Sequence, residues 1–244
     1  MIAIIGGSGL ARLAGLAHQR REIVRTPYGD PSGPLTFGEL ENVPIAFLAR
    51  HGYGHTIAPH EINYRANVWA LKSAGVEGIV SVATVGGIRA DFGPGVLVAP
   101  DQIIDYTWGR RSTYFEGSEN PVRHVDFTDP YDARLRRRLL DAARAESIDL
   151  VDGGTYGCTQ GPRLETTAEI RRLERDGCDL VGMTGMPEAA LAREQDLPYA
   201  AVAVVVNHAA GKGDSENGIS LEAIGPVMDQ AMARVRALLA AFVR

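Results

Sequence analysis

The chain has 244 residues, of which 45% are hydrophobic, and this composition suits one large α/β domain covering residues 1–244. Its formal net charge of −5 at pH 7 argues against a general nucleic-acid binder. The two cysteines cannot build a disulfide framework, no signal peptide precedes the first predicted strand, and no apolar run reaches transmembrane length, so we expect a cytoplasmic protein without membrane contacts.

The N-terminal segment predicts a buried strand followed by a glycine-rich turn. Residues 2–5 are apolar, and the turn GGSGL places Ser8 among glycines whose backbone N–H groups can approach an anion closely. A dinucleotide site would need a different glycine spacing and a long helix, whereas residues 11–18 predict only a short helix. The turn therefore favours a small anion over a dinucleotide.

A predicted hairpin of residues 35–40 and 44–49 leads to the next polar group. Arg50 and His51 follow its second strand directly and stand beside a glycine. Arginine supplies a planar fork of N–H donors and histidine a directional one, so this strand end also fits an anion. The alternative is an arginine that pairs with a surface acid and a histidine that lies in a turn.

The middle of the chain alternates helix and strand. A helical pattern spans residues 62–74, and a buried strand at 79–82 ends in a second glycine-rich turn that carries Ala83 and Thr84. Two further short strands are predicted between residues 96 and 106. The hydroxyl of Thr84 thus follows a strand, as that of Ser8 does.

A long polar segment without periodicity covers residues 107–130 and contains His124. A loop of this length in a compact domain is usually functional or part of an interface, although it could instead cover its own subunit. An amphipathic helix over residues 131–146 and a strand over residues 155–159 follow it.

Residues 161–194 predict a turn, a helix, a short strand, a turn and a second helix. Glu165 precedes the helix predicted at 168–175, and Thr184 follows the strand predicted at 179–182. Positions just past the carboxyl ends of strands line the usual ligand crevice of an α/β sheet. We therefore expect a carboxylate and a hydroxyl from this segment at a single small-molecule site.

The last part of the chain predicts a central strand and a closing helix. Residues 199–206 form a run of Ala and Val typical of a buried parallel strand, which ends at Asn207, and residues 221–242 form an amphipathic helix. The alternation of strands and helices predicts a three-layer α/β fold with a mixed, partly barrel-like central sheet flanked by helices.

The polar strand ends together offer hydroxyls from Ser8, Thr84 and Thr184, a guanidinium, an imidazole and several backbone N–H groups. This set suits inorganic phosphate. It does not suit a metal ion, because no carboxylates or histidines stand at ligand spacing.

Several motifs resemble the purine nucleoside phosphorylase and methylthioadenosine phosphorylase superfamily. They are GPRLETTAE with MTGMPEAALARE, and IIGGSGL, LARHG and SVATVGGIR, so the resemblance covers nearly the whole chain. It implies a nucleoside-phosphorylase-like fold and a phosphate site. The phosphate ligands that it implies are Ser8, Arg50, His51, Ala83 through its backbone, Thr84 and Thr184.

The same resemblance implies the nucleoside contacts. Met183 would pack on the sugar, and His124, in HVDFTDPY, resembles a residue that a neighbouring subunit of a homotrimer lends to the site. The substrate-binding residues that it implies are Leu164, Glu165, Met183, Asn207, Ala209, Leu221 and His124, and the catalytic ones are His51, Glu165 and Asn207.

The implied reaction is phosphorolysis, in which a nucleoside and phosphate give a free base and a pentose 1-phosphate. Phosphate is a co-substrate, and no cofactor is expected. The departing purine gathers negative charge, which hydrogen-bond donors stabilise. The alternatives are a nucleoside hydrolase, which would need a carboxylate or metal near the ribose, and a non-catalytic binding module, which would leave the polar strand ends unexplained.

Glu165 and Asn207 predict a preference for 6-oxopurines. An ionised Glu165 only accepts hydrogen bonds, so it matches the N1–H of a 6-oxopurine and repels the bare N1 of adenine, while the Asn207 amide can donate to O6 and engage N7. The methylthioadenosine branch carries two aspartates at this strand end, where the chain has Asn207 and Ala209. The alternative is that Glu165 only caps its helix.

Leu221 predicts an apolar 5′ substituent. Oxopurine-specific relatives bind the 5′-hydroxyl through a histidine fourteen residues past the asparagine, and that count from Asn207 reaches Leu221. Leucine cannot bond a hydroxyl but can cover a methylthio group. The expected substrate is S-methyl-5′-thioinosine, cleaved to hypoxanthine and S-methyl-5-thioribose 1-phosphate. Methylthioadenosine, or inosine and guanosine, remain alternatives if Leu221 is only a core residue of the final helix or if His208 or His124 supplies a donor.

Overall fold

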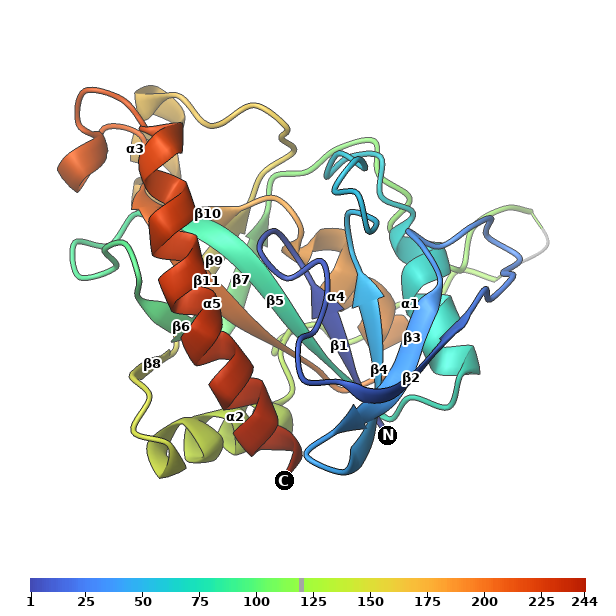
Figure 1. Ribbon diagram of the computed structural model, residues 1–244. Helices are drawn as coiled ribbons and strands as arrows, with labels where there is room; N and C mark the ends of the chain where they lie inside the picture. The colour runs from blue at the N-terminus through green and yellow to red at the C-terminus, as the bar shows by residue number, and fades with distance from the viewer. Residues whose placement is uncertain (119–120) are drawn as a thin grey trace.

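The computed structural model describes residues 1–118 and 121–244, and in these residues eleven strands join into one mixed sheet at the centre of the molecule (Figure 1). The strands are β1 (Ile2–Gly6), β2 (Ala17–Glu22), β3 (Leu35–Leu40), β4 (Val43–Ala49), β5 (Gly78–Gly87), β6 (Leu97–Ala99), β7 (Gln102–Asp105), β8 (Leu150–Asp152), β9 (Thr155–Cys158), β10 (Leu180–Gly182) and β11 (Tyr199–His208). Their main path is β2-β3-β4-β1-β5-β10-β9-β7.

The sheet divides at β5. The first half of β5 pairs in parallel with β1, most of its length lies parallel to β11, and Gly86 and Gly87 pair antiparallel with β10. From β11 a second arm continues to β6 and β8. The expected mixed sheet is confirmed; it branches at β5 and does not close into a barrel.

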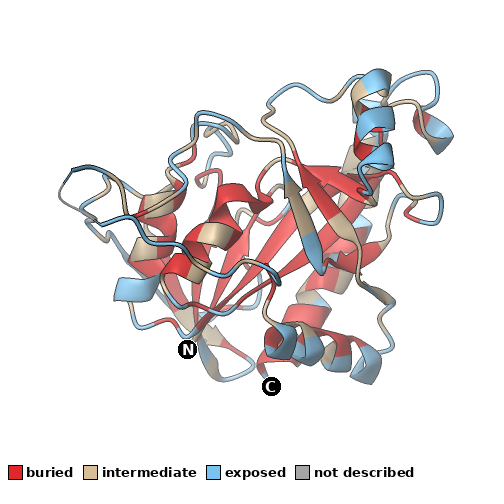
Figure 2. Cartoon of the chain, turned by 180° about the vertical axis from the view of Figure 1, so that it is seen from behind, coloured by how far each residue is buried: buried red, intermediate tan, exposed pale blue. Residues whose placement is uncertain are grey.

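Helices cover both faces of the sheet. They are α1 (Tyr64–Ser73), α2 (Ala133–Ala145), α3 (Thr167–Arg175), α4 (Gly185–Glu194) and α5 (Leu221–Val243). α1 and α4 share one apolar cluster with the sheet, and α2 and α5 share another on the opposite face (Figure 1). Figure 2 shows the central strands between them as buried, as expected for the runs of Val, Ile and Ala in β1, β4, β5 and β11. The predicted three-layer fold is confirmed.

One predicted helix is wrong. Residues 11–18 form turns, and β2 begins within them at Ala17. Gly15 and His18 have φ angles of 84° and 49°, in the left-handed region that a right-handed helix excludes. The apolar residues Leu13 and Leu16 are buried, but they cover the sheet from a loop. The hydrophobic pattern of eight residues is too short to distinguish a helix from a loop that buries two leucines.

A predicted turn is also wrong. Residues 83–87 continue β5, because β11 pairs with them from Ala83 opposite Ala203 to Gly87 opposite His208. Thr84 therefore projects from a strand. The short strand β8 was not predicted at all; its three residues are too few for a periodic pattern.

The irregular segment at residues 107–130, described except for 119 and 120, contains no helix or strand in its described part, as predicted. Its first part packs against α1 and α4. The Tyr114 hydroxyl donates to the Arg65 carbonyl at 2.9 Å, and the Tyr114 N–H donates to Glu194 Oε2 at 2.8 Å. The start of this loop is thus fixed to the body of the domain.

The parallel strands β1, β4, β5 and β11 bring their carboxyl ends to one edge of the sheet, while both chain termini lie at the opposite end (Figure 1). Such an edge is where α/β proteins usually bind ligands. Among the described residues no helix combines the length and the apolar character that a bilayer span requires.

Candidate active site

A cavity of about 700 Å³ lies at this edge of the sheet. The ends of β1, β4, β10 and β11, the middle of β5 and the start of α5 all contribute to its wall. Every site residue implied by the sequence lines it except His124. These lining residues are Ser8, Arg50, His51, Ala83, Thr84, Leu164, Glu165, Met183, Thr184, Asn207, Ala209 and Leu221.

The floor of the cavity contains a buried ion pair. Arg50 Nε donates to Glu188 Oε2 at 2.7 Å and its Nη2 donates to Glu188 Oε1 at 2.9 Å, with both side chains at most 1% exposed. Burial opposes the charge of Arg50, but the carboxylate of Glu188 outweighs it and raises the pKa of Arg50. Arg50 does pair with an acid, as the alternative held, yet that acid comes from α4 and is buried.

Arg50 keeps little hydrogen-bonding capacity for a ligand. Its Nη1 also donates to the Val82 carbonyl at 2.9 Å and its Nη2 to Ser81 Oγ at 2.5 Å, so the bonds within the described residues use four of its five N–H donors. A side chain at Gly7 would stand 2.8 Å from Nη1, so glycine there leaves this nitrogen approachable. One guanidinium N–H remains for an anion.

His51 is neutral at neutral pH. Its Nδ1 lies 2.8 Å from the Ile57 carbonyl and must donate to it, which leaves Nε2 with a lone pair. Burial and the nearby charge of Arg50 lower the pKa of His51 to about 4. The expected directional donor is therefore an acceptor in the free site, suited to a phosphate oxygen that carries a proton.

His55 belongs to the site but was missed. Its Nε2 lies 2.8 Å from Ser8 Oγ, and its ring stands 4.7 Å from that of His51. The loop after β4 carries it into the cavity wall. The available signal was a second histidine four residues after His51 in a glycine-rich segment.

The remaining hydroxyls come from two elements. Thr84 projects from β5, and Thr184 stands directly before α4, where it makes no side-chain capping hydrogen bond. Two N–H groups at the start of α4 already have partners, because that of Thr184 lies 3.4 Å from the Tyr156 hydroxyl and that of Met186 donates to Cys158 Sγ at 3.2 Å. The hydroxyls of Ser8, Thr84 and Thr184 thus line the same cavity as Arg50.

A β-bulge places Asn207. The register between β11 and β5 shifts after Val205, so Asn207 lies opposite Gly86. Its amide nitrogen donates to the His208 carbonyl at 2.6 Å, which leaves one N–H and the amide oxygen for a ligand. His208 turns toward Asp214, 3.5 Å away, and does not line the cavity, so it is not the alternative donor.

Glu165 does not cap a helix. The N-cap of α3 is Thr166, which forms a reciprocal capping box with Glu169. The Glu165 carboxylate instead lines the cavity and accepts a hydrogen bond of 2.6 Å from the Thr159 hydroxyl. The capping alternative is therefore wrong.

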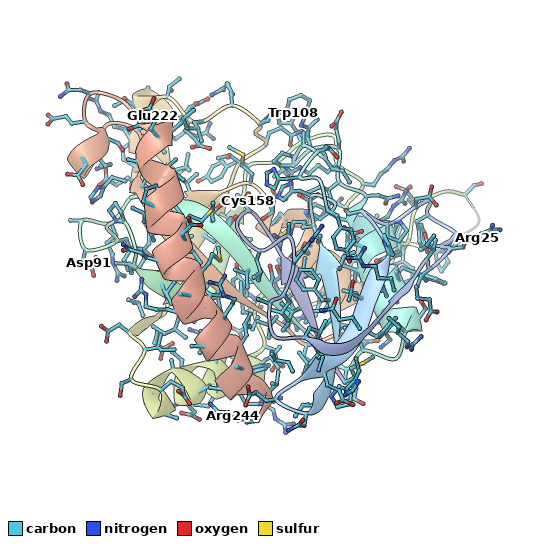
Figure 3. The ribbon with its side chains drawn as sticks, in the orientation of Figure 1. Arg25, Asp91, Trp108, Cys158, Glu222 and Arg244 are labelled. Carbon is cyan, nitrogen blue, oxygen red and sulfur yellow. The ribbon has the colours of Figure 1, made fainter. Side chains whose placement is uncertain are left out.

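The outer part of the cavity is apolar and open. Leu221 is the first residue of α5 and is 70% exposed, so it is not a core residue, and Leu164 across the cavity is 42% exposed. Ile219, Ile224 and Met228 continue the apolar wall. In Figure 3, Glu222 and Trp108 mark this same end of the molecule.

His124 is exposed on the long loop and is absent from the cavity wall. The start of the same loop packs against its own chain through Tyr114, in line with the alternative that the loop covers its own subunit, and the place of His124 at a neighbour's site stays a prediction. Cys158 and Cys178 are free buried thiols, as expected, and Cys158 lies near the centre of the molecule in Figure 3.

The chain is similar to known proteins over its whole length. The family described as "Phosphorylase superfamily" matches residues 1–244. A protein of Xanthomonas campestris named probable S-methyl-5′-thioinosine phosphorylase is 54% identical over 93% of the chain and 90% of that protein. The 6-oxopurine nucleoside phosphorylase of Pyrococcus furiosus is 49% identical over 86% of the chain and 80% of that protein.

Solved structures agree with the fold. Methylthioadenosine phosphorylase from Schistosoma mansoni, in complex with adenine, superposes with a TM-score of 0.94 at 33% identity and covers 99% of the chain and 90% of that structure's chain. A methylthioadenosine phosphorylase from an antarctic soil metagenomic library gives 0.91 at 39% identity, covering 99% and 84%.

Proposed function

The chain belongs to the phosphorylase superfamily, and we propose that it cleaves S-methyl-5′-thioinosine with inorganic phosphate to hypoxanthine and S-methyl-5-thioribose 1-phosphate. It is a pentosyltransferase of the nucleoside phosphorylase type. The observation that carries the choice of substrate is one cavity that joins Glu165 and Asn207 to an apolar wall around Leu221. Relatives named for this activity at 52–57% identity support it.

Phosphate binds at the inner end of the cavity, among Ser8, Thr84, Thr184 and the free N–H of Arg50. The ion pair with Glu188 balances the arginine charge, so hydrogen bonds supply much of the anion binding. No metal or organic cofactor takes part. The phosphate lies beneath the sugar, attacks C1′ as the bond to N9 lengthens, and offsets the positive charge that develops on the ring.

The base lies between Glu165 and Asn207. The carboxylate oxygen of Glu165 that is not bonded to Thr159 accepts the N1–H of hypoxanthine, and the remaining N–H of Asn207 donates to the base. Such a donor stabilises the negative charge that the purine acquires on departure. An adenine base would present a bare N1 to a carboxylate, which is a mismatched pair.

The 5′-methylthio group lies against the apolar wall formed by Leu221, Ile219, Ile224 and Met228. A 5′-hydroxyl in this position would lose its water without gaining a partner from these side chains. Methylthio nucleosides are therefore favoured over inosine.

We also propose a homotrimer that acts in the cytoplasm. The outer cavity wall is exposed in the single chain, and a neighbouring subunit that brings His124 to this opening would cover it. The free thiols fit a reducing compartment. Light scattering measures the assembly, and a monomer with full activity would rule the trimer out.

The substrate proposal is tested by comparing kcat/KM for methylthioinosine, inosine and methylthioadenosine at saturating phosphate. Methylthioinosine should lead by at least about tenfold, which corresponds to ~1.4 kcal/mol. If inosine equals it, the apolar 5′ pocket is wrong. If methylthioadenosine leads, the roles of Glu165 and Asn207 are wrong.

Phosphate dependence is measured in the same assay. Base release should require phosphate and should yield a sugar phosphate. Release of base in water alone, at the same rate, would identify a hydrolase instead.

A further inference from the structure

Thr159 stands directly behind the base-binding carboxylate. It follows β9, and its Oγ1 donates to Glu165 Oε1 at 2.6 Å. Thr159 does not line the main cavity, so it does not touch the base itself. Any influence that it has on the reaction must pass through Glu165.

The hydroxyl of Thr159 has a single proton to give. The Gly182 carbonyl lies 3.3 Å from the same oxygen, but Glu165 Oε1 is nearer, at 2.6 Å, so Glu165 takes the stronger bond. Oε1 is then occupied, and the other oxygen of Glu165 is left to meet a ligand. One hydroxyl thereby sets both the rotation of the carboxylate and the number of its free acceptors.

The backbone around Thr159 is held in place by neighbours from the sugar side of the cavity. Its N–H donates to the Gly182 carbonyl at 2.8 Å. The guanidinium of Arg110 donates to the carbonyls of Gln160 at 2.9 Å and Met183 at 2.8 Å, which joins the turn before Glu165 to the turn that carries Met183. These bonds fix the backbone position of Thr159, so its hydroxyl can hold the Glu165 carboxylate in one orientation.

We propose that Thr159 is a positioning residue that determines the preference for 6-oxopurines, an inference that rests on the function proposed above. A donor held against Oε1 keeps Glu165 an acceptor, which suits an N1–H. Without that donor the carboxylate can rotate away from N1, so a bare N1 of a 6-aminopurine is no longer held against an acceptor.

The experiment compares Thr159→Val, which keeps the shape of the side chain and removes the hydroxyl, with Thr159→Ser, which restores a hydroxyl. The quantity measured is kcat/KM for methylthioinosine divided by kcat/KM for methylthioadenosine, at saturating phosphate. We expect the ratio to fall by about tenfold or more in Thr159→Val and to stay within about twofold of wild type in Thr159→Ser. The KM for phosphate should not change.

Two further variants isolate the pathway of the effect. In a Glu165→Ala background, Thr159→Val should change the ratio no further, because the side chain through which Thr159 acts is gone. Thr155→Val is the matched control, since Thr155 lies at the other end of β9 and does not line the cavity. It should leave the ratio unchanged.

An unchanged ratio in Thr159→Val, with both substrates slowed alike, would overturn the inference and leave Thr159 a purely structural residue. A change that persists in the Glu165→Ala background would overturn it too. These outcomes are distinct from failure of the proposed function, which would appear as a wild-type enzyme without preference for methylthioinosine.

Discussion

The two ends of the cavity are built in opposite ways. At the phosphate end Arg50 and Glu188 are fully buried and His51 is 7% exposed, whereas at the 5′ end Leu164 and Leu221 are 42% and 70% exposed. The inner end is complete within one chain, with its donors already oriented by other side chains. The outer end is an apolar opening that is uncovered in the single chain.

This difference predicts which substitutions affect the fold and which affect the choice of substrate. A change at the inner end leaves a buried group without its partner, so it destabilises the chain as well as the site. A change at the outer end removes contacts that are made mainly with the substrate, so stability should hardly change.

The largest effect is expected for Arg50→Met. It leaves the Glu188 carboxylate buried without a counter-charge, with the hydrogen bond from Tyr199 still in place, and should lower the free energy of unfolding by about 3–5 kcal/mol in urea titrations. Leu164→Ser, at the opening, should change it by less than about 0.5 kcal/mol. Arg144→Met removes an exposed ion pair with Asp141 and is the control for loss of a surface charge.

The double variant Arg50→Met/Glu188→Leu, which removes both charges, should recover much of the lost stability although the phosphate site is gone. If the free energy of unfolding of Arg50→Met lies within about 1 kcal/mol of the wild-type value, the buried ion pair does not stabilise the inner end of the cavity.

The next effect concerns the base, at the middle of the cavity. Asn207→Asp replaces an amide that can donate with a carboxylate that only accepts, and it should shift the kcat/KM ratio toward methylthioadenosine by about tenfold to a hundredfold. Asn42→Asp, in the exposed β3–β4 turn, is the control. An unaltered ratio would mean that Asn207 does not contact the 6-position.

A smaller effect at the inner end depends on pH. The pKa of His51 is lowered to about 4 by burial and by Arg50, from about 6.5 in an unfolded chain. The unfolded chain therefore binds the proton first, so this contribution to stability is fully present above about pH 6.5 and is lost as the pH falls toward 4.

In His51→Gln the free energy of unfolding should decrease less between about pH 6.5 and 4 than in wild type. His60→Gln, in an exposed turn, should behave like wild type. A parallel fall in wild type and His51→Gln would exclude His51 as its source.

The smallest effect is expected at the opening. Leu221→Ala should reduce kcat/KM for methylthioinosine by about fivefold, equivalent to ~1 kcal/mol, and should alter inosine less. The change is modest because Leu221 is 70% exposed before substrate binds. Ile23→Ala, at a residue 79% exposed and away from the cavity, is the matched control. Equal losses for both nucleosides would mean that Leu221 does not contact the 5′ substituent.

Much of the site followed from the sequence because its residues adjoin local patterns. The apolar runs of β1, β4 and β11 predict buried strands, and Ser8, Arg50 and Asn207 stand just beyond or at their ends. Since parallel strands finish at one edge, side chains far apart in the chain were expected to share a cavity, and they line it. The helix predicted at 168–175 likewise forms, as α3 with Thr166 at its N-cap.

The sequence by itself determined the strands, the polar groups at their ends and the chemical character of each. Only the tertiary structure decided how those groups are paired. Glu188 neutralises Arg50 from 138 residues away, a bulge in β11 turns Asn207 toward Gly86, and Thr159 orients Glu165. The reason is physical: a strand or a cap depends on neighbours along the chain, whereas a buried charge takes whichever partner the packing of distant elements brings within hydrogen-bond distance.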